Sequence, residues 1–396
     1  MQGAAGTRHG KVYRVRLARF LELDEGTISA WAHLEERALE CNAYLSPSFM
    51  IPSMRHLATP IEVRESMFVF VEKTGGGGGD LVGAGVFVRS SGSHRFPLPH
   101  LRAFTSPHSY LSGMLVDRDE AEGVIRTFFR LFCGKDAPWH GVEFENFPSE
   151  GRQAERIAEV AEEFGATWTG HKTSRRAVFL PAEGGEKYMQ ENFTSRRIKN
   201  LRQTRRRLEE MGEVRWRVLR GTEATELSVE RFLEIEHTGW KAKDGTSLRS
   251  QPSHEAFFRE MVDGFRKSEN LFFTELSLDG VVIALTSNLI SGGGGFAFKI
   301  GFHQDFEKFS PGVLNEIECI RHAPGQLGDL EFIDSGAEEG SFIEQFWMRR
   351  RILSSGLFGA TSIGRRMLSG IQLLRRAKRW SRSFNNRNGE KPCPQS

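Results

Sequence analysis

The chain has 396 residues, about twice the length of a common domain, so two domains are expected. Hydrophobic residues make up 39% and charged residues 27%, which is typical of a folded protein and excludes a largely disordered chain. The formal net charge of +3 is too small to draw the whole chain to nucleic acid, and no apolar run is long enough to span a membrane. The four cysteines are far apart, and the first residues show neither an apolar core nor a cleavage site, so we expect a cytoplasmic protein.

In the first half, apolar residues recur at three- and four-residue intervals from Thr27 to Leu45 and predict a helix, which Pro47 and Pro52 should end. The glycine run at 75–79 joins two apolar runs and predicts a hairpin tip. No helix follows these glycines and no Lys-Ser or Lys-Thr pair ends them, which argues against a phosphate-binding loop. The other elements predicted here are strands at 66–72, 81–88, 141–146, 166–169 and 176–180, and helices at 117–132 and 150–164.

The second half begins with a long helix from Tyr188, very basic over Ser195–Met211, which Gly212 should end. Asp279-Gly280 between two apolar runs is typical of a two-residue hairpin turn. The other elements predicted here are strands at 214–219, 271–278, 281–290, 295–302 and 330–334, and helices at 223–241, 253–265, 310–322 and 342–353.

Both halves show the same order of hairpin, strand, helix, strand and helix, over 68–164 and 271–353. This repetition predicts two α/β (α+β) domains, each with a mixed central sheet flanked by helices. We place an N-terminal domain at 1–183, a C-terminal domain at 184–355 and a tail at 356–396.

One strand of the second half leads through a short loop into Ser310-Pro311-Gly312 at the start of a helix. Ser310 can cap the helix, Pro311 suits its first turn, and Gly312 allows a ligand close to the backbone. The free N–H groups and the helix dipole favour an anion such as a pyrophosphate. The alternative is an ordinary helix cap.

Four blocks, in this order and spacing, resemble GNAT-fold N-acyltransferases, in the branch of CelD-type polysaccharide-biosynthesis proteins that is related to the FemAB aminoacyltransferases. The likeness covers roughly residues 190 to 350. The blocks are SRRIKNLRQTRRRLEEMG from 195, EHTGWKAKDGT from 236, LSLDG from 276 and FKIGFHQDFEKFSPG from 298.

The resemblance implies tandem GNAT-like domains, with acyl-CoA as the co-substrate of the second. In this fold two central strands splay apart around the pantetheine arm, and the next helix start binds the pyrophosphate. An amine then attacks the thioester directly, which requires placement of the reactants, a proton acceptor and oxyanion stabilisation. The residues implied to bind the cofactor are Lys299, Ile300, Phe302, Ser310, Pro311, Gly312 and Val313.

Two carboxylates are candidate proton acceptors: Glu236, in the second block, and Asp334, at the end of a predicted strand. The alternatives are a solvated helix residue and a turn-forming aspartate. Trp240 and Lys241 are candidate walls of the acceptor pocket, although a tryptophan at a helix end can simply be packed. Strand alternation places Lys299 on the face opposite Phe298 and Ile300, where its charge needs a partner, so we expect it to face the substrate.

The basic helix carries a cationic stripe that includes Arg202 and Arg206. This stripe can be an ordinary solvated face. Alternatively, it can bind a phosphate-bearing acceptor, the cofactor phosphates or RNA. The tail from 362 to 391 is basic and partly amphipathic, which suits either an anionic membrane surface or a solvated terminus. The first half has Ser106-Pro107-His108 instead of Ser-Pro-Gly, so we expect it to lack a cofactor and to shape a wall of the acceptor groove.

We therefore expect an N-acyltransferase that acylates an amine, such as an amino sugar or another cell-envelope or polysaccharide precursor. It should be cytoplasmic, with peripheral contact to the inner membrane surface through its tail as an option. No histidine or cysteine spacing indicates a metal or a catalytic triad. The alternatives are a FemAB-like transferase that uses aminoacyl-tRNA, in which nucleic acid would be a partner, and a non-catalytic scaffold of a polysaccharide-synthesis complex.

Overall fold

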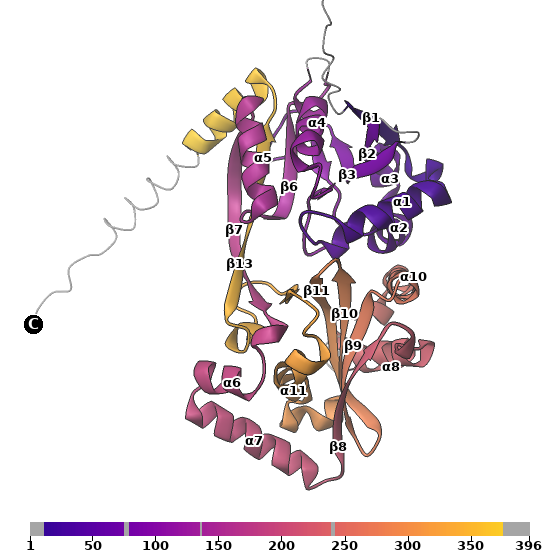
Figure 1. Cartoon of the computed structure of the whole chain (residues 1–396), viewed down its shortest axis with the longest axis vertical. Coiled ribbons are helices and arrows are strands. Elements are labelled where there is room, and N and C mark those ends of the chain that lie inside the picture. The colour runs from indigo at the N-terminus through magenta and orange to yellow at the C-terminus, as the bar shows by residue number, and fades with distance from the viewer. Residues whose placement is uncertain (1–11, 75–78, 135–136, 239–241, 375–396) are drawn as a thin grey trace, which may run out of the picture.

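The computed structural model describes residues 12–74, 79–134, 137–238 and 242–374. They form two lobes that share one mixed sheet, with strand order β1-β2-β3-β4-β6-β13-β7-β12-β11-β10-β9-β8 and β5 paired with β3 (Figure 1). The strands of the N-terminal half are β1 (Val12–Ala18), β2 (Ser66–Thr74), β3 (Asp80–Ser90), β4 (His100–Ala103), β5 (Leu115–Val116), β6 (Gly141–Pro148) and β7 (Thr167–Phe179). Those of the C-terminal half are β8 (Val214–Arg220), β9 (Leu271–Leu278), β10 (Val281–Ser291), β11 (Gly294–Phe302), β12 (Phe332–Asp334) and β13 (Arg349–Gly359).

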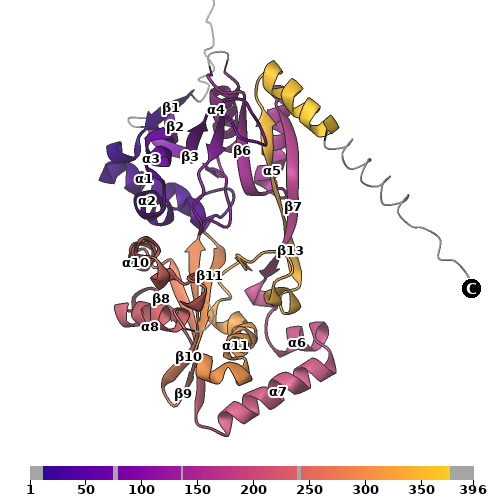
Figure 2. The ribbon, with the colours of Figure 1, turned by 180° about the vertical axis from the view of Figure 1, so that it is seen from behind.

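Helices cover both faces of each lobe, and the views from the front and from behind agree (Figures 1 and 2). The predicted α/β arrangement, with a mixed sheet flanked by helices, is confirmed. The helices of the N-terminal half are α1 (Glu25–Glu36), α2 (Pro47–His56), α3 (Pro60–Glu65), α4 (Ala121–Cys133) and α5 (Arg152–Glu163). Those of the C-terminal half are α6 (Glu186–Asn192), α7 (Ser195–Glu209), α8 (Glu226–Glu236), α10 (Pro252–Lys267), α11 (Pro311–Gln326) and a helix at 362–374.

The sheet of the C-terminal lobe separates two cores. Phe232 of α8 and Phe258 of α10 pack with Leu285 of β10 on one face. Leu208 of α7 and Leu314 of α11 pack with neighbouring residues of β9 and β10 on the other. The N-terminal half joins the first of these cores through α2 and the segments beside it, so the two lobes have a common apolar interface.

The two lobes exchange strands. β7 and β13 pair antiparallel along their lengths, from Val178↔Arg349 to Thr167↔Gly359. β13 also pairs with β6 of the N-terminal lobe, while the end of β7 pairs with β12 of the C-terminal lobe. Each lobe therefore contains a strand from the other half of the chain, and β13 crosses the domain boundary predicted at residue 355.

Two sequence predictions about this exchange were wrong. The strands predicted at 166–169 and 176–180 are parts of the single strand β7, and the helix predicted at 342–353 is a short 3-10 turn, Phe342–Gln345, followed by β13. Apolar residues recur at helix-like intervals around residue 346. In the structure, Phe346 instead packs in the same apolar cluster as Tyr188. The chain beyond Phe346 pairs with strands on both sides, so tertiary pairing overrides local propensity.

The helix predicted from Thr27 to Leu45 ends earlier, at Glu36. Pro47 begins α2 instead of ending a helix, because the Ser46 hydroxyl caps the first turn and proline suits that position.

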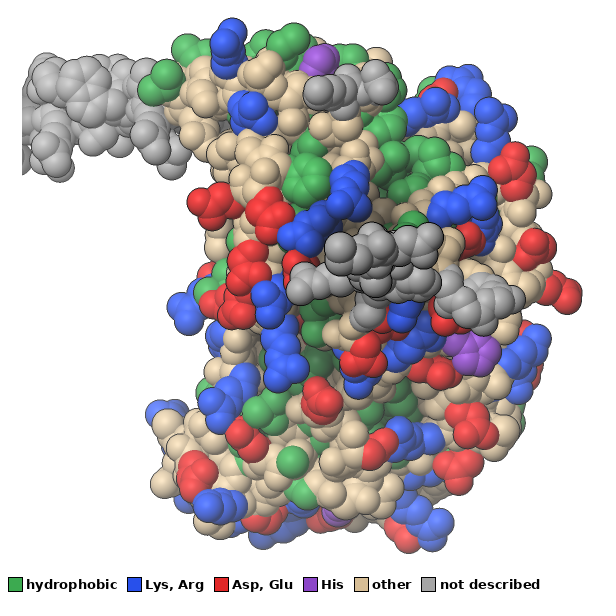
Figure 3. Space-filling model, turned by 45° about the horizontal axis from the view of Figure 1, so that its top comes forward, with side chains coloured by type: hydrophobic (Ala, Val, Ile, Leu, Met, Phe, Trp, Pro, Cys, Tyr) green, Lys and Arg blue, Asp and Glu red, His purple; other side chains and the backbone are tan. Residues whose placement is uncertain are grey.

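Among the described helices, none combines the length and the apolar composition that a membrane span requires. On the face drawn in Figure 3, positive and negative side chains are interspersed, in keeping with the small net charge.

Candidate functional site

The sheet opens between two parallel strands of the C-terminal lobe. β11 and β12 pair at only three positions, from Gly294↔Phe332 to Phe296↔Asp334. β12 ends there, while β11 continues to Phe302 without that neighbour. The rest of β11 therefore lacks a paired strand on the β12 side among the described residues, and the chain after β12 leaves the sheet before it returns as β13.

Two adjacent cavities follow this opening. The inner one has a volume of about 210 Å³ and lies between β11, α11 and the segment that follows β12. The outer one has a volume of about 280 Å³ and lies at the start of α11. Ile300 and Phe342 belong to the walls of both cavities, so the two are neighbours along one path. Tyr110 of the N-terminal half completes the inner wall.

The outer cavity is lined by the start of α11, including Ser310, Pro311, Gly312 and Val313. Ser310 has a left-handed backbone, with φ 47° and ψ 55°, and its side chain makes no capping hydrogen bond, so the predicted cap was wrong. Capping needs an extended backbone, which this residue lacks. A β-carbon at Gly312 would lie 3.3 Å from Ile300 Cδ1, so a side chain there would enter the wall of the path.

Glu316, one turn further along α11, lines the inner cavity and was missed by sequence reasoning. Its side chain is buried, and Thr286 Oγ1 of β10 donates a hydrogen bond to Oε1 at 3.2 Å. Burial raises the pKa of this carboxyl to about 7, because the low-dielectric surroundings disfavour its charged form. The sequence signal was the polar set Asn315, Glu316 and Glu318 among the apolar residues of this helix segment.

Lys299 also lines the inner cavity, but not in the predicted orientation. The ladder pairs Ser287 with Lys299 and Asn288 with Ala297, so Phe298 forms a β-bulge. The bulge interrupts the two-residue alternation, and Lys299 Nζ lies 5.7 Å from the ring centres of both Phe298 and Tyr110. Lys299 therefore shares the face of Phe298, which corrects the expectation.

Residues 195–342 match the family model of the acetyltransferase (GNAT) domain. The chain is therefore a mixed α/β protein with a GNAT domain in its C-terminal half. A crystal structure of FemX is similar with a TM-score of 0.54 and 8% sequence identity, over 84% of this chain and 96% of that one.

Two further structures are similar at lower TM-scores. The C-terminal domain (DUF2156) of a putative lysylphosphatidylglycerol synthetase from Agrobacterium fabrum has a TM-score of 0.48 and 11% identity, over 85% of this chain and 92% of that one. A tandem GNAT protein from the clavulanic acid biosynthesis pathway has a TM-score of 0.40 and 13% identity, over 88% of this chain and 99% of that one. No curated protein sequence matches this chain.

Glu236 lies at the end of α8 in the GNAT domain, on the other side of β11 from α11. It is 2% exposed, and its Oε2 accepts the Leu248 N–H at 2.9 Å. A β-carbon at Gly301 would lie 3.0 Å from the Glu236 nitrogen, so α8 packs directly on the strand. Neither cavity wall includes Glu236. Its carboxylate orders the turn at Leu248, and its predicted role as proton acceptor stays a prediction.

Asp334, the other predicted acceptor, lies at the strand exchange and is 0% exposed. Its Oδ1 accepts the Gly336 N–H at 2.8 Å and lies 3.7 Å from Arg176 Nη1. Its Oδ2 lies 3.4 Å from Arg351 Nη1, and Arg351 also pairs with Glu40. This network joins β7, β12 and β13, so the arrangement suits a structural ion cluster better than a free base.

The other predicted substrate-binding residues are not brought into the cavities by the described structure. Trp240 and Lys241 lie outside the described residues. Arg202 and Arg206 are exposed on α7, where they pair with Glu186 at 3.6 Å and Glu210 at 3.3 Å. Among the described residues, no group of three or more His, Cys, Asp or Glu side chains is placed to hold a metal ion.

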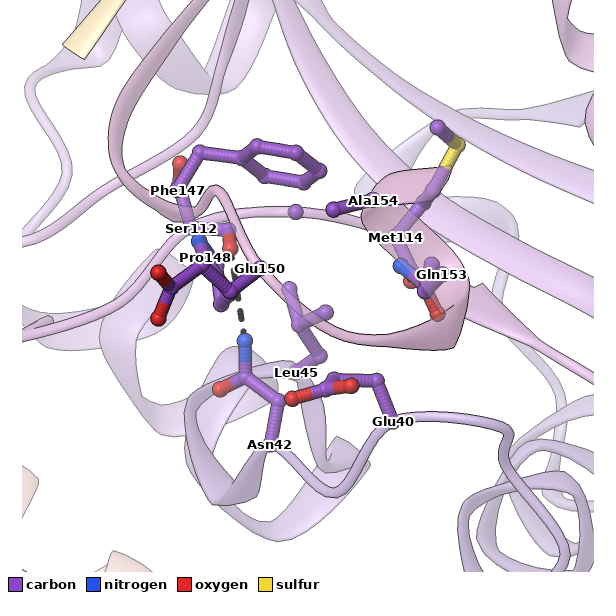
Figure 4. Close-up of a pocket in the computed structure, with 11 residues that line it drawn as sticks. Glu40, Asn42, Leu45, Ser112, Met114, Phe147, Pro148, Glu150, Gln153 and Ala154 are labelled. Carbon is purple, nitrogen blue, oxygen red and sulfur yellow. Dashed lines mark hydrogen bonds between the residues drawn. The ribbon is translucent and has the colours of Figure 1, made fainter. Parts of the chain in front are cut away.

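The N-terminal lobe has a cavity of about 450 Å³ between α5, β7 and β13, with Ile157, Trp168 and Phe358 in its wall. It also has a much smaller cavity near its own sheet, with a volume of about 10 Å³ (Figure 4). Asn42 Nδ2 donates a hydrogen bond to the Ser112 carbonyl across it at 3.3 Å. This volume suits a single water and not a cofactor. The same lobe extends residues 104–114 toward the C-terminal lobe, which is how Tyr110 reaches the inner cavity.

Proposed function

We propose that this protein is an N-acyltransferase that transfers an acyl group from acyl-CoA to an amine in the C-terminal GNAT domain. The path from the start of α11 to the opening between β11 and β12 carries the proposal. A helix start attracts phosphate through its unpaired N–H groups and its dipole. The diphosphate of CoA would lie at Ser310–Val313, and the pantetheine arm would follow β11 past Phe302 and Ile300.

The thioester would then lie in the inner cavity, near Lys299 and Tyr110. The amine attacks the thioester carbonyl carbon, the C–S bond breaks, and the CoA thiolate leaves. Glu316 is a carboxyl in the cavity wall, and its pKa of about 7 suits acceptance of the proton that the amine loses. Glu236 and Asp334 remain the second choices, because each already has a partner elsewhere.

For the acceptor, the resemblance to CelD-type proteins supports an amino sugar or another cell-envelope or polysaccharide precursor, in the cytoplasm or at the inner membrane surface. The described part of the tail supports only a limited membrane contact. Leu368 packs on Phe96 and Leu357 of the N-terminal lobe, so it is not available to lipid. Ile363 and Leu374 are exposed on the same helix.

The second candidate function is transfer from aminoacyl-tRNA, and the exposed arginines of α7 are the observation that favours it. A cationic stripe suits a phosphate backbone, and RNA binding through it would fall steeply with salt. This candidate predicts that wild type retains tRNA at low salt and that the double variant Arg202→Ala with Arg206→Ala does not. If the double variant loses acyl transfer although the wild type binds no tRNA, the acyl-CoA hypothesis is favoured.

The test of the CoA site is calorimetric titration with acetyl-CoA of wild type, Gly312→Trp and Gly325→Trp. Gly325 lies on the same helix, and a β-carbon there would meet nothing within 4 Å, so this variant is a matched control. We expect binding by wild type and the control, and none by Gly312→Trp. At a ligand concentration 100 times Kd, binding should stabilise the fold by about 2.7 kcal/mol. Absence of saturable binding by the wild type would refute the proposal and favour a non-catalytic scaffold.

A further inference from the structure

Lys299 is a partly buried cation that has no carboxylate counter-ion among the described residues. Elsewhere in the molecule, buried and partly buried arginines are paired: Arg176 and Arg351 with Asp334, and Arg205 with Glu318. Removing a charge from water is costly unless an opposite charge or hydrogen bonds compensate it. The inner cavity therefore contains a positive group whose compensation comes only from two aromatic rings and solvent.

His108 and His254, the two histidines on which the Lys299 charge acts, are neutral. His108 Nε2 and His254 Nδ1 lie 3.2 Å apart, and His108 stacks on Phe257 with the ring centres 5.4 Å apart. Burial and then the Lys299 charge lower the pKa of His108 to about 3, and the same two causes lower the pKa of His254. Two neutral imidazoles provide no counter-ion, and His108 Nδ1 is buried with no hydrogen-bond partner among the described residues.

Glu316 is the carboxyl that shares the cavity, but it does not neutralise Lys299. It bonds to Thr286 and makes no ion pair with the lysine in the described structure. Burial dominates its raised pKa, with only the Thr286 hydrogen bond acting in the opposite direction. The Lys299 ammonium therefore has no ion-pair partner among the described residues at the inner end of the path, and an incoming anionic ligand can pair with it.

We propose that Lys299 and Tyr110 form a subsite for an anionic group, a carboxylate or a phosphate, on one of the reactants that meet in the inner cavity. This inference rests on the proposed acyl-CoA site, because that site places the reacting groups at this end of the path. A lysine ammonium provides three donors and a compact charge, and the Tyr110 ring from the other lobe lines the cavity beside it. The anionic group is carried either by the acyl chain or by the acceptor amine.

The first arm of the test examines the acyl chain and needs no acceptor. Butyryl-CoA and succinyl-CoA have acyl chains of similar length and differ in a terminal carboxylate. Calorimetry would give their Kd values for wild type, Lys299→Met, Lys299→Arg and Lys308→Met. Lys308 is an exposed lysine near the outer cavity and serves as the control. We expect the wild type, the control and Lys299→Arg to favour succinyl-CoA about tenfold, and Lys299→Met to lose the preference.

The second arm examines the acceptor. The CoA-saturated protein is titrated with glucosamine and with glucosamine 6-phosphate, using the same variants. A preference of about tenfold for the phosphate form that depends on Lys299 would assign the anion to the acceptor. A Lys299-dependent preference in either arm supports the subsite.

The failures of the two proposals are distinguishable. If the acyl-CoA esters bind to the wild type but neither arm shows a preference, or if Lys299→Met retains it, the anionic subsite is wrong and the CoA site stands. If no CoA ester binds to the wild type, both proposals are wrong. Thermal unfolding of Lys299→Met shows whether this variant is folded. If it is not, the comparison of wild type with Lys299→Arg, which keeps the positive charge, still tests the subsite.

Discussion

Replacement of Glu316 by glutamine should change the pH dependence of stability by an amount that follows from its burial. The carboxyl has its ordinary pKa of 4.5 in the unfolded chain, and burial raises the pKa to about 7 in the fold. The native state therefore holds a proton that the unfolded state releases between these values. Stability from this group is present in full below about pH 4.5 and is lost as the pH rises through about 7.

The difference between these pKa values corresponds to about 3 kcal/mol of unfolding free energy, at roughly 1.4 kcal/mol for each pKa unit. The glutamine side chain is neutral at all pH values and can still accept the Thr286 hydrogen bond. We therefore expect wild type to lose about 3 kcal/mol relative to Glu316→Gln between pH 4.5 and pH 8. Urea denaturation at both pH values measures this difference.

Glu35 provides a matched control. It is buried in α1, burial raises its pKa to about 7 as well, and neither cavity of the proposed site includes it. Glu35→Gln should show the same pH dependence of stability, whereas only Glu316→Gln should slow acyl transfer. A stability difference between wild type and Glu316→Gln that stays constant from pH 4.5 to pH 8 would refute the reasoning about burial.

Four further variants test the rest of the structure. Asp334→Asn leaves two buried arginines without their shared counter-charge and should cost about 3 to 5 kcal/mol in urea denaturation. Exposed Arg206→Ala should cost less than about 1 kcal/mol, so equal losses would contradict the ion cluster. Glu236→Gln retains an acceptor for the Leu248 N–H and should leave both stability and acyl transfer nearly unchanged, whereas loss of transfer alone would make Glu236 the proton acceptor. Truncation after Leu353 removes most of the part of β13 that pairs with β6, and hydrogen exchange should show loss of protection in the N-terminal lobe.

Local signals in the sequence predicted most of the elements that build the cofactor path. Asp279-Gly280 predicted the hairpin of β9 and β10, and Ser310-Pro311-Gly312 predicted the start of α11 after a strand. Such signals depend on turn chemistry and on the first residues of a helix, which involve only near neighbours in the chain. The order of the elements predicted a mixed sheet flanked by helices, which the sheet topology confirms, and the resemblance of four sequence blocks predicted a GNAT domain, which the family match over residues 195–342 confirms.

Tertiary structure alone decided the exchange of β7 and β13, the bulge at Phe298 and the entry of Tyr110 into a cavity of the other lobe. It also decided that Glu316 points into that cavity. Each of these features depends on a pairing between residues far apart in the chain. A two-residue or 3.6-residue period fixes which face a side chain is on, but not which distant strand or lobe meets that face.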